Sequence, residues 1–154
     1  MKKTLMVLLA VFICLAVGWA GELKVIPADS EHVGDIKIVK GNLEIGKNAD
    51  LAGNIFIEEG DLFIADNVDI VGAVTIKKGN VFIENSFDIS RSITVEQGNV
   101  TMGGENDVQG DIICKNGIVK MGRNNDIEGD VYAKELKMGI NSDISGTFHK
   151  TGDK

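Results

Sequence analysis

The chain has 154 residues, of which 44% are hydrophobic and 25% charged, and its formal net charge at pH 7 is −7. This acidic balance gives no electrostatic basis for binding nucleic acid or an anionic membrane surface. The length fits one domain. The two cysteines, Cys14 and Cys114, lie in segments of different character, and we expect no disulfide between them.

Residues 1–20 have the composition of a signal peptide. Lys2 and Lys3 precede an unbroken apolar run from Leu5 to Val17, and small residues follow at Gly18 and Ala20. We expect cleavage after Ala20 and export to the periplasm, the cell surface or the extracellular space. The run is shorter than the roughly 20 residues of a membrane span. We expect no membrane span in the chain after cleavage. The alternative is that this segment is retained as an N-terminal anchor.

Residues 21–32 are predicted to form an N-terminal cap. This segment contains Leu23, Val25, Ile26 and the only proline of the chain, Pro27. A short apolar strand here would cover the first turn of the repeat that follows. Removal of the leader moves the formal charge from −7 to −9, because the leader holds two lysines and no acid.

Residues 33–148 contain an internal repeat with a period of 19 residues. The pattern GDIKIVKGNLEIGKNADL begins at Gly34 and returns with substitutions from Gly53, Gly72, Arg91 and Gly110, and in shortened form from Gly129. A fixed period in this range is typical of a solenoid, in which each repeat is one coil stacked on the previous one.

Within each repeat, apolar residues recur at a spacing of two and are separated by glycine turns. Such spacing predicts short strands with one buried face. We therefore predict an all-β fold, a single-stranded right-handed parallel β-helix of six coils plus an incomplete seventh. The left-handed hexapeptide β-helix is the main alternative, but its three equal sides favour 18 residues per coil and a six-residue subrepeat, and the sequence has neither. Cys114 falls in an aliphatic column that starts at Ile38, and we expect a buried thiol.

One acidic column is present in all six coils. Two interpretations are open: the carboxylates accept backbone hydrogen bonds within their own turns, or they hold a ladder of Ca²⁺ ions with help from nearby asparagines. No other cofactor is expected. The column consists of Asp50, Asp69, Asp88, Asp107, Asp126 and Asp143.

The expected interaction residues are apolar side chains at the two ends and aromatic side chains on the outside. Phe56, Phe63 and Phe82 are predicted to point outward, and Phe63 and Phe82 share one column. At the C-terminal end, Phe148 continues the column of Ile36, and a polar tail, 149–154, follows it. An open parallel edge is a template for another chain, so we expect end-to-end self-association. Leu23, Val25 and Ile26 are the corresponding residues at the N-terminal end.

No catalytic constellation is present. Every coil keeps or shortens its length, so no long loops can build a cleft, and His32 and His149 lie at opposite ends of the predicted solenoid. We interpret the chain as non-enzymatic. Two function classes are open: an exported structural protein that associates end to end with itself, and a secreted or surface binding module that recognises a cell-envelope protein or glycan through its aromatic face.

The repeat resembles that of bactofilins. The resemblance rests on the segment Ile45 to Ile55 (IGKNADLAGNI) and its counterpart Met121 to Val131 (MGRNNDIEGDV), and it extends over nearly all of 33–148. It implies a small right-handed parallel β-helix that polymerises without nucleotide, through its apolar end coils, into filaments. The export signal is a departure from that family, whose members are cytoplasmic.

Overall fold

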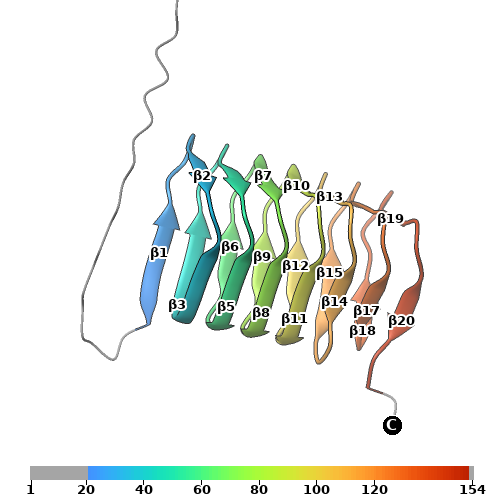
Figure 1. Ribbon diagram of the computed structural model, residues 1–154. Coiled ribbons are helices and arrows are strands. Elements are labelled where there is room, and N and C mark those ends of the chain that lie inside the picture. Colours follow the sequence, from blue (N-terminus) through green and yellow to red (C-terminus); the bar gives the residue numbers. More distant parts are fainter. Residues whose placement is uncertain (1–20, 153–154) are drawn as a thin grey trace, which may run out of the picture.

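The computed structural model describes residues 21–152, and the predicted signal peptide, 1–20, lies outside the described residues. Twenty strands stack in a regular row, with β1 at one end and β20 at the other (Figure 1). In the described part of the chain, no helix is long and apolar enough to cross a membrane. Neighbouring strands pair in parallel, and partners such as Ile36 and Ile55 lie 19 residues apart. The predicted all-β parallel solenoid with a 19-residue repeat is confirmed.

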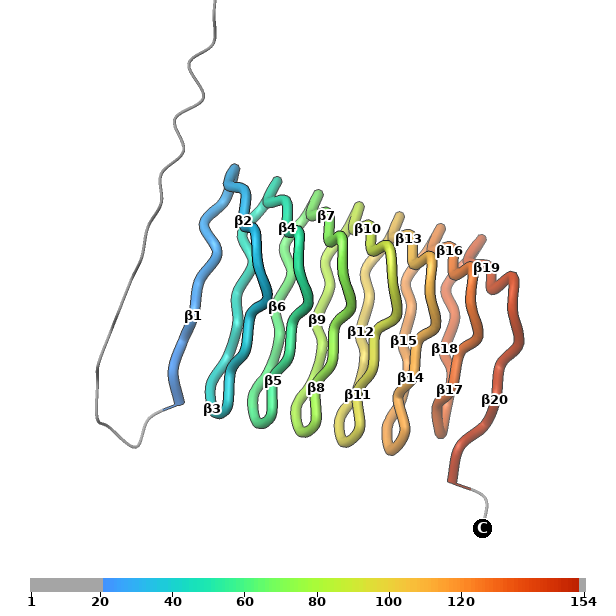
Figure 2. Tube along the Cα trace, viewed as in Figure 1, coloured from blue at the N-terminus to red at the C-terminus, as the bar shows by residue number. Residues whose placement is uncertain are grey.

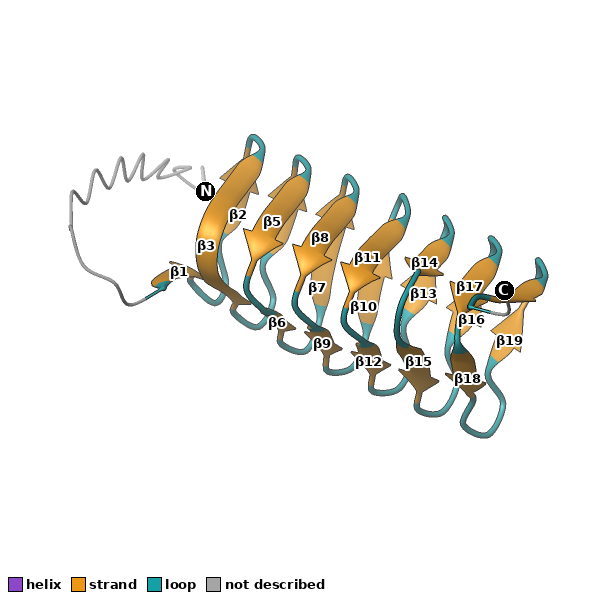
Figure 3. Ribbon diagram, turned by 90° about the horizontal axis from the view of Figure 1, so that it is seen from below, coloured by secondary structure: helices purple, strands orange, loops and turns teal. Residues whose placement is uncertain are grey.

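Each coil contributes one strand to each of three faces, which we call A, B and C. Figure 2 shows the chain passing repeatedly around these faces, and Figure 3 shows the coils from below. Face A consists of β1 (Glu22–Ile26), the second half of β3 (Ile36–Ile45), β6 (Leu62–Ile64), β9 (Val81–Ile83), β12 (Val100–Met102), β15 (Ile118–Met121) and β18 (Glu135–Lys137).

The other two faces have the same number of described strands. Face B consists of β2 (Glu31–Val33), β4 (Asp50–Ala52), β7 (Val68–Val71), β10 (Phe87–Ile89), β13 (Asp107–Val108), β16 (Asp126–Ile127) and β19 (Asp143–Ile144). Face C consists of the first half of β3, β5 (Ile55–Glu59), β8 (Val74–Lys78), β11 (Ile93–Gln97), β14 (Ile112–Cys114), β17 (Val131–Ala133) and β20 (Phe148–Lys150).

The register between coils places identical sequence positions on top of one another. Ile55 pairs with Val74, and Val74 with Ile93, so each partner lies one full repeat further along the chain. Val131 pairs with Phe148, which follows it after the shortened last repeat. Inward side chains of the internal coils are almost completely buried, and most of them lie in columns that the sequence predicts. Cys114 has no exposed surface, as predicted, and burial raises the pKa of its thiol.

A further inward column changes from apolar to polar along the solenoid. Ala49, Val68 and Phe87 occupy it in the first coils, and Asn106 and Asn125 follow, each 1% exposed. The amide pair forms its own hydrogen bonds: Asn106 Nδ2 donates to Asn125 Oδ1 at 2.8 Å, and Asn125 Nδ2 donates to the Gly103 carbonyl at 2.9 Å. The two side chains are thus buried with their hydrogen-bonding groups satisfied.

The tight turn between faces C and A depends on a stack of glycines. Gly79 has φ +146°, and a Cβ atom built there would lie 1.8 Å from the Gly60 carbonyl oxygen of the preceding coil. A side chain at this position would therefore force the two coils apart. The predicted requirement for glycine in this turn has two causes, the backbone angle and the close approach of coils.

We expect Gly79→Ala to lower the free energy of unfolding by about 1–3 kcal/mol more than Gly34→Ala does. Gly34 is the matched control because its φ is also positive, at +117°, but a Cβ atom built there would have no other atom within 4 Å. Urea unfolding followed by circular dichroism measures both losses. Equal losses would show that the close approach between coils contributes nothing.

Candidate interaction surfaces

The acidic column lies on the outer side of face B. Asp69 pairs with Asp88, and Asp88 with Asp107, so the carboxylates lie one above another. All six side chains are exposed except that of Asp107, which is half-buried. Their side chains accept no hydrogen bond from any described residue, and Asp107 Oδ1 is buried without a partner. The prediction that these carboxylates accept backbone hydrogen bonds within their own turns is therefore wrong.

Other polar columns carry those hydrogen bonds. At the corner between faces B and C, Asp35 Oδ1 accepts the backbone N–H of Asn54 at 2.7 Å, and Asp111 Oδ1 accepts that of Asp130 at 2.8 Å. At the turn between faces C and A, Asp61 Oδ1 accepts the N–H of Asn80 at 2.7 Å. Each of these carboxylates therefore bonds the next coil and not its own turn.

The asparagines that were considered as calcium ligands have a conformational role. Asn48, Asn67, Asn124 and Asn141 all have positive φ, between 54° and 59°, at the corner between faces A and B. Asparagine tolerates this left-handed conformation better than most residues. Among the described residues, no group of three or more His, Cys, Asp or Glu side chains is placed to hold a metal ion.

No positively charged side chain forms an ion pair with the acidic column among the described residues, and the pKa of Asp88 is raised. Removal from solvent raises the pKa of Asp88, and the neighbouring carboxylates of Asp69 and Asp107 raise it further. The charged form of Asp88 is therefore less favourable in the folded chain than in the unfolded chain. The charge of Asp88 therefore reduces stability at neutral pH.

The C-terminal end of the solenoid exposes apolar side chains that are buried in every internal coil. Phe148, in the column of Val131, is 38% exposed, and Met138 is 44% exposed, whereas Met121 in the preceding coil is 3% exposed. Leu136 and Ile144, in the inward columns of Val119 and Ile127, pack only partly against the core. Ile140 at the corner is 79% exposed and follows the exposed Arg123, so it does not belong to a buried column. We call Phe148, Met138, Leu136, Ile144 and Ile140 the C-terminal apolar end.

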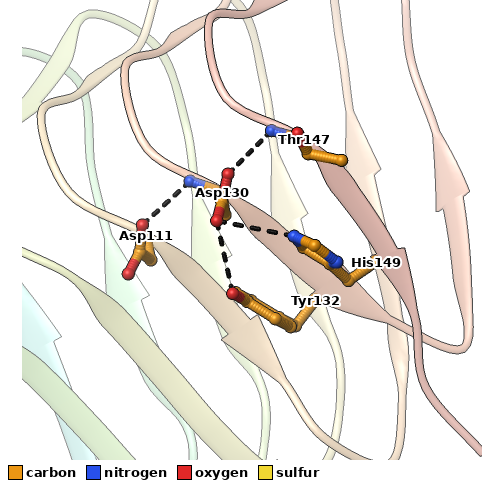
Figure 4. Close-up of polar contacts among 5 residues, drawn as sticks. All are labelled: Asp111, Asp130, Tyr132, Thr147 and His149. Carbon is orange, nitrogen blue, oxygen red and sulfur yellow. Dashed lines mark hydrogen bonds and ion pairs between the residues drawn. The ribbon is translucent and has the colours of Figure 1, made fainter.

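A polar cluster fastens the last strand to this end. Asp130 Oδ1 accepts the backbone N–H of Thr147 at 2.8 Å, and Asp130 Oδ2 lies 3.3 Å from the Tyr132 hydroxyl and 3.5 Å from His149 Nε2 (Figure 4). The Tyr132 and His149 rings stack with centroids 4.5 Å apart. The hydrogen bond from Thr147, with smaller contributions from Tyr132 and His149, lowers the pKa of Asp130. Strand β20 thus extends to Lys150, into the segment predicted as a tail.

The N-terminal end has a different character. Strand β1 pairs with β3 and covers the first coil on face A, as expected for a cap. Ile26 is only 5% exposed and stacks on Ile45, so it is a core residue and presents no surface for interaction. Lys24 and His32 occupy inward columns beside Leu43 and Leu51, so this end is more polar than the C-terminal end.

The exposed apolar residues of β1 belong to the outer side of face A. Leu23 and Val25 are 56% and 52% exposed. Val25, Phe63 and Phe82 line one side of a groove of about 430 Å³, and the small residues Gly46 and Ala65 lie beside them. Leu23 and Val25 therefore lie on the side of the solenoid and not at its end, because the pairing of β1 with β3 directs them outward.

The predicted aromatic surface is divided between two faces. Phe63 and Phe82, each 38% exposed, stack on face A with ring centroids 5.1 Å apart and an interplanar angle of 10°. Phe56 lies on face C, where the ammonium groups of Lys37 and Lys77 lie 5.8 and 5.3 Å from its ring centroid. Phe63 and Phe82 each cover one ring face of the other.

We expect Asp88→Asn to stabilise the protein at pH 7 by a few tenths of a kcal/mol to about 1 kcal/mol, since exposed charges are strongly screened. The folded-state pKa of Asp88 is raised, so its destabilising effect is absent below the ordinary pKa of 3.8 and complete above the folded-state pKa. Urea unfolding at pH 7 and pH 3 should therefore show the gain only at pH 7.

Calcium provides the control for this experiment. If the column held a calcium ladder, excess Ca²⁺ would raise the urea midpoint of the unmodified chain relative to EDTA, and Asp88→Asn would lose that gain. We expect equal midpoints in Ca²⁺ and EDTA for both proteins.

No protein-family model matches the chain, and no curated protein or solved structure matches it either. Inference about function therefore rests on the geometry of the described residues.

Proposed function

We propose that the chain is a non-enzymatic structural protein that is exported and associates end to end with itself into filaments or a scaffold. The C-terminal apolar end is the observation that carries this proposal. Phe148 and Met138 occupy columns that are filled by the next coil everywhere else in the solenoid. A second copy can supply the missing coil.

The strand edges support the same contact. Strands β18, β19 and β20 are the last strands of faces A, B and C, and each has a neighbour on one side only within the described residues. Unpaired parallel edges pair readily with further strands. Burial of apolar surface contributes about 25 cal/mol per Å², so the apolar residues at this end add to the backbone hydrogen bonds.

The strands at one end of the solenoid also complement those at the other end. Within residues 21–152, the first strands, β1 and β2, lie on faces A and B, and the last strand, β20, lies on face C. Placed end to end, β20 of one copy and β1 and β2 of the next make up one complete coil. A contact between unlike ends repeats without closing and produces an open filament.

The polar side chains of the N-terminal end limit the strength of this contact. In the continued register, Lys24 would follow Leu136 and His32 would follow Ile144. The apolar part of the contact is therefore concentrated around Phe148, which would meet Ile36, and Met138, which would meet Ile26.

We expect Phe148→Asp to abolish the end-to-end assembly of the purified full chain into filaments, because the substitution places a charge in the centre of the contact. Val71→Asp is the matched control: Val71 is 66% exposed on face B, away from both edges. Light scattering followed by negative-stain electron microscopy, in buffers with and without EDTA, measures the assembly. Circular dichroism checks that both variants keep their strand content.

Long assemblies in EDTA that persist in Val71→Asp and vanish in Phe148→Asp would support end-to-end association. A stable monomer of the unmodified chain in both buffers would contradict it. That outcome would favour a monomeric binding module that uses the groove beside Phe63 and Phe82.

A further inference from the structure

The outer side of face A carries one column in which charge and hydrophobicity are arranged in order. The register between strands places seven side chains in this column, one per coil. From the N-terminal to the C-terminal end they are Val25, Glu44, Phe63, Phe82, Thr101, Lys120 and Lys137. The acid is near one end, the lysines are near the other, and the stacked aromatic pair lies between them.

The surroundings of this column permit close approach of another molecule. The positions that flank it on the side of face B are mostly small, and Gly46 and Ala65 lie in the groove of about 430 Å³ beside the two phenylalanines. The remaining members of this flank are Pro27, Glu84, Gly103, Gly122 and Gly139. Neither Glu44 nor Lys120 forms an ion pair with another described residue. Both charges are exposed and available to a partner.

We propose that face A is a lateral contact between two copies of this chain that lie side by side with their solenoid axes antiparallel. The two copies are related by a two-fold axis that runs along the strand direction at the coil of Phe82. The axis places this column of one copy against the same column of the other copy, with the order of the side chains reversed. Phe82 then meets Phe82, Phe63 meets Thr101, and Glu44 meets Lys120 on each side of the axis. Val25 lies against the aliphatic stem of Lys137.

The charge order selects this orientation over the parallel one. With parallel axes, each side chain of the column faces its own copy, so Glu44 meets Glu44 and Lys120 meets Lys120. Like charges facing across an interface suppress association, whereas two Glu44–Lys120 pairs favour it and fix the register. The apolar centre with a charged rim is the usual composition of a protein interface.

One contact in this arrangement is unfavourable. Glu84 lies in the same coil as Phe82, on the flank of the column, so the two-fold axis brings the two Glu84 side chains together. This lateral contact is separate from the end-to-end contact, because it uses the side of the solenoid and neither end. A filament with free lateral faces could therefore pair with a second filament of opposite direction.

Charge reversal tests the proposal in a Phe148→Asp, Cys14→Ser background of the full chain, which separates lateral from end-to-end association. We expect this parent to form a dimer in sedimentation equilibrium, and Glu44→Lys or Lys120→Glu to weaken dimerisation by about tenfold or more. The double variant should restore the dimer, since the two opposite charges face each other again. Lys37→Glu on face C is the matched control and should leave the dimer unchanged.

Disulfide formation gives a second readout that does not depend on charge. In the same background, Glu84→Cys should form a cross-linked dimer on mild oxidation, because the residue faces its own copy, whereas Ser90→Cys in the same coil on face B should not. A monomeric parent at all concentrations would overturn the proposal. So would single charge reversals without effect, a double variant as weak as the single ones, or equal cross-linking at both positions.

Discussion

The parallel pairing of each coil with the next, at a constant step along the sequence, is the constraint on which the rest of this structure depends. It places every residue directly above its counterpart, so each sequence position becomes a column along the solenoid. A column of aliphatic residues then fills the interior, and a column of asparagines or aspartates bonds the backbone of one coil to the side chains of another. A coil alone cannot form these contacts, and its stability comes from its two neighbours.

The same constraint also multiplies unfavourable interactions. Six aspartates at one position become a row of exposed carboxylates on face B, and removal from solvent together with its neighbours raises the pKa of Asp88. A single acid on a globular surface would have little effect, but a repeated acid meets its own copies above and below. The ends of the solenoid show a related effect. Side chains in columns that are buried in internal coils are exposed where no further coil covers them, as at Phe148.

Sequence patterns predicted the fold well because the repeat itself encodes the register. Columns with constant residue type, such as Ile36, Ile55 and Ile93, were identified from spacing alone, and so were the glycine turns and the buried Cys114. The column of Val68, Phe87 and Asn106 was missed because its residue types change along the solenoid. The outward position of Val25 and the buried position of Ile26 depend on how β1 pairs with β3, which no internal repeat indicates.

The buried amides of Asn106 and Asn125 have a consequence for the order in which the coils stack. Coils with the same register are nearly interchangeable, so a repeat protein can misfold by pairing a coil with the wrong neighbour or by exchanging coils between chains. A shift by one coil would place Asn125 against Phe87, or Asn106 against Val68, and would break the hydrogen bond between the two amides, at a cost of about 0.5–1.5 kcal/mol. The hydrogen bond between the amides therefore favours the native order of these two coils over a shifted one, from inside the core.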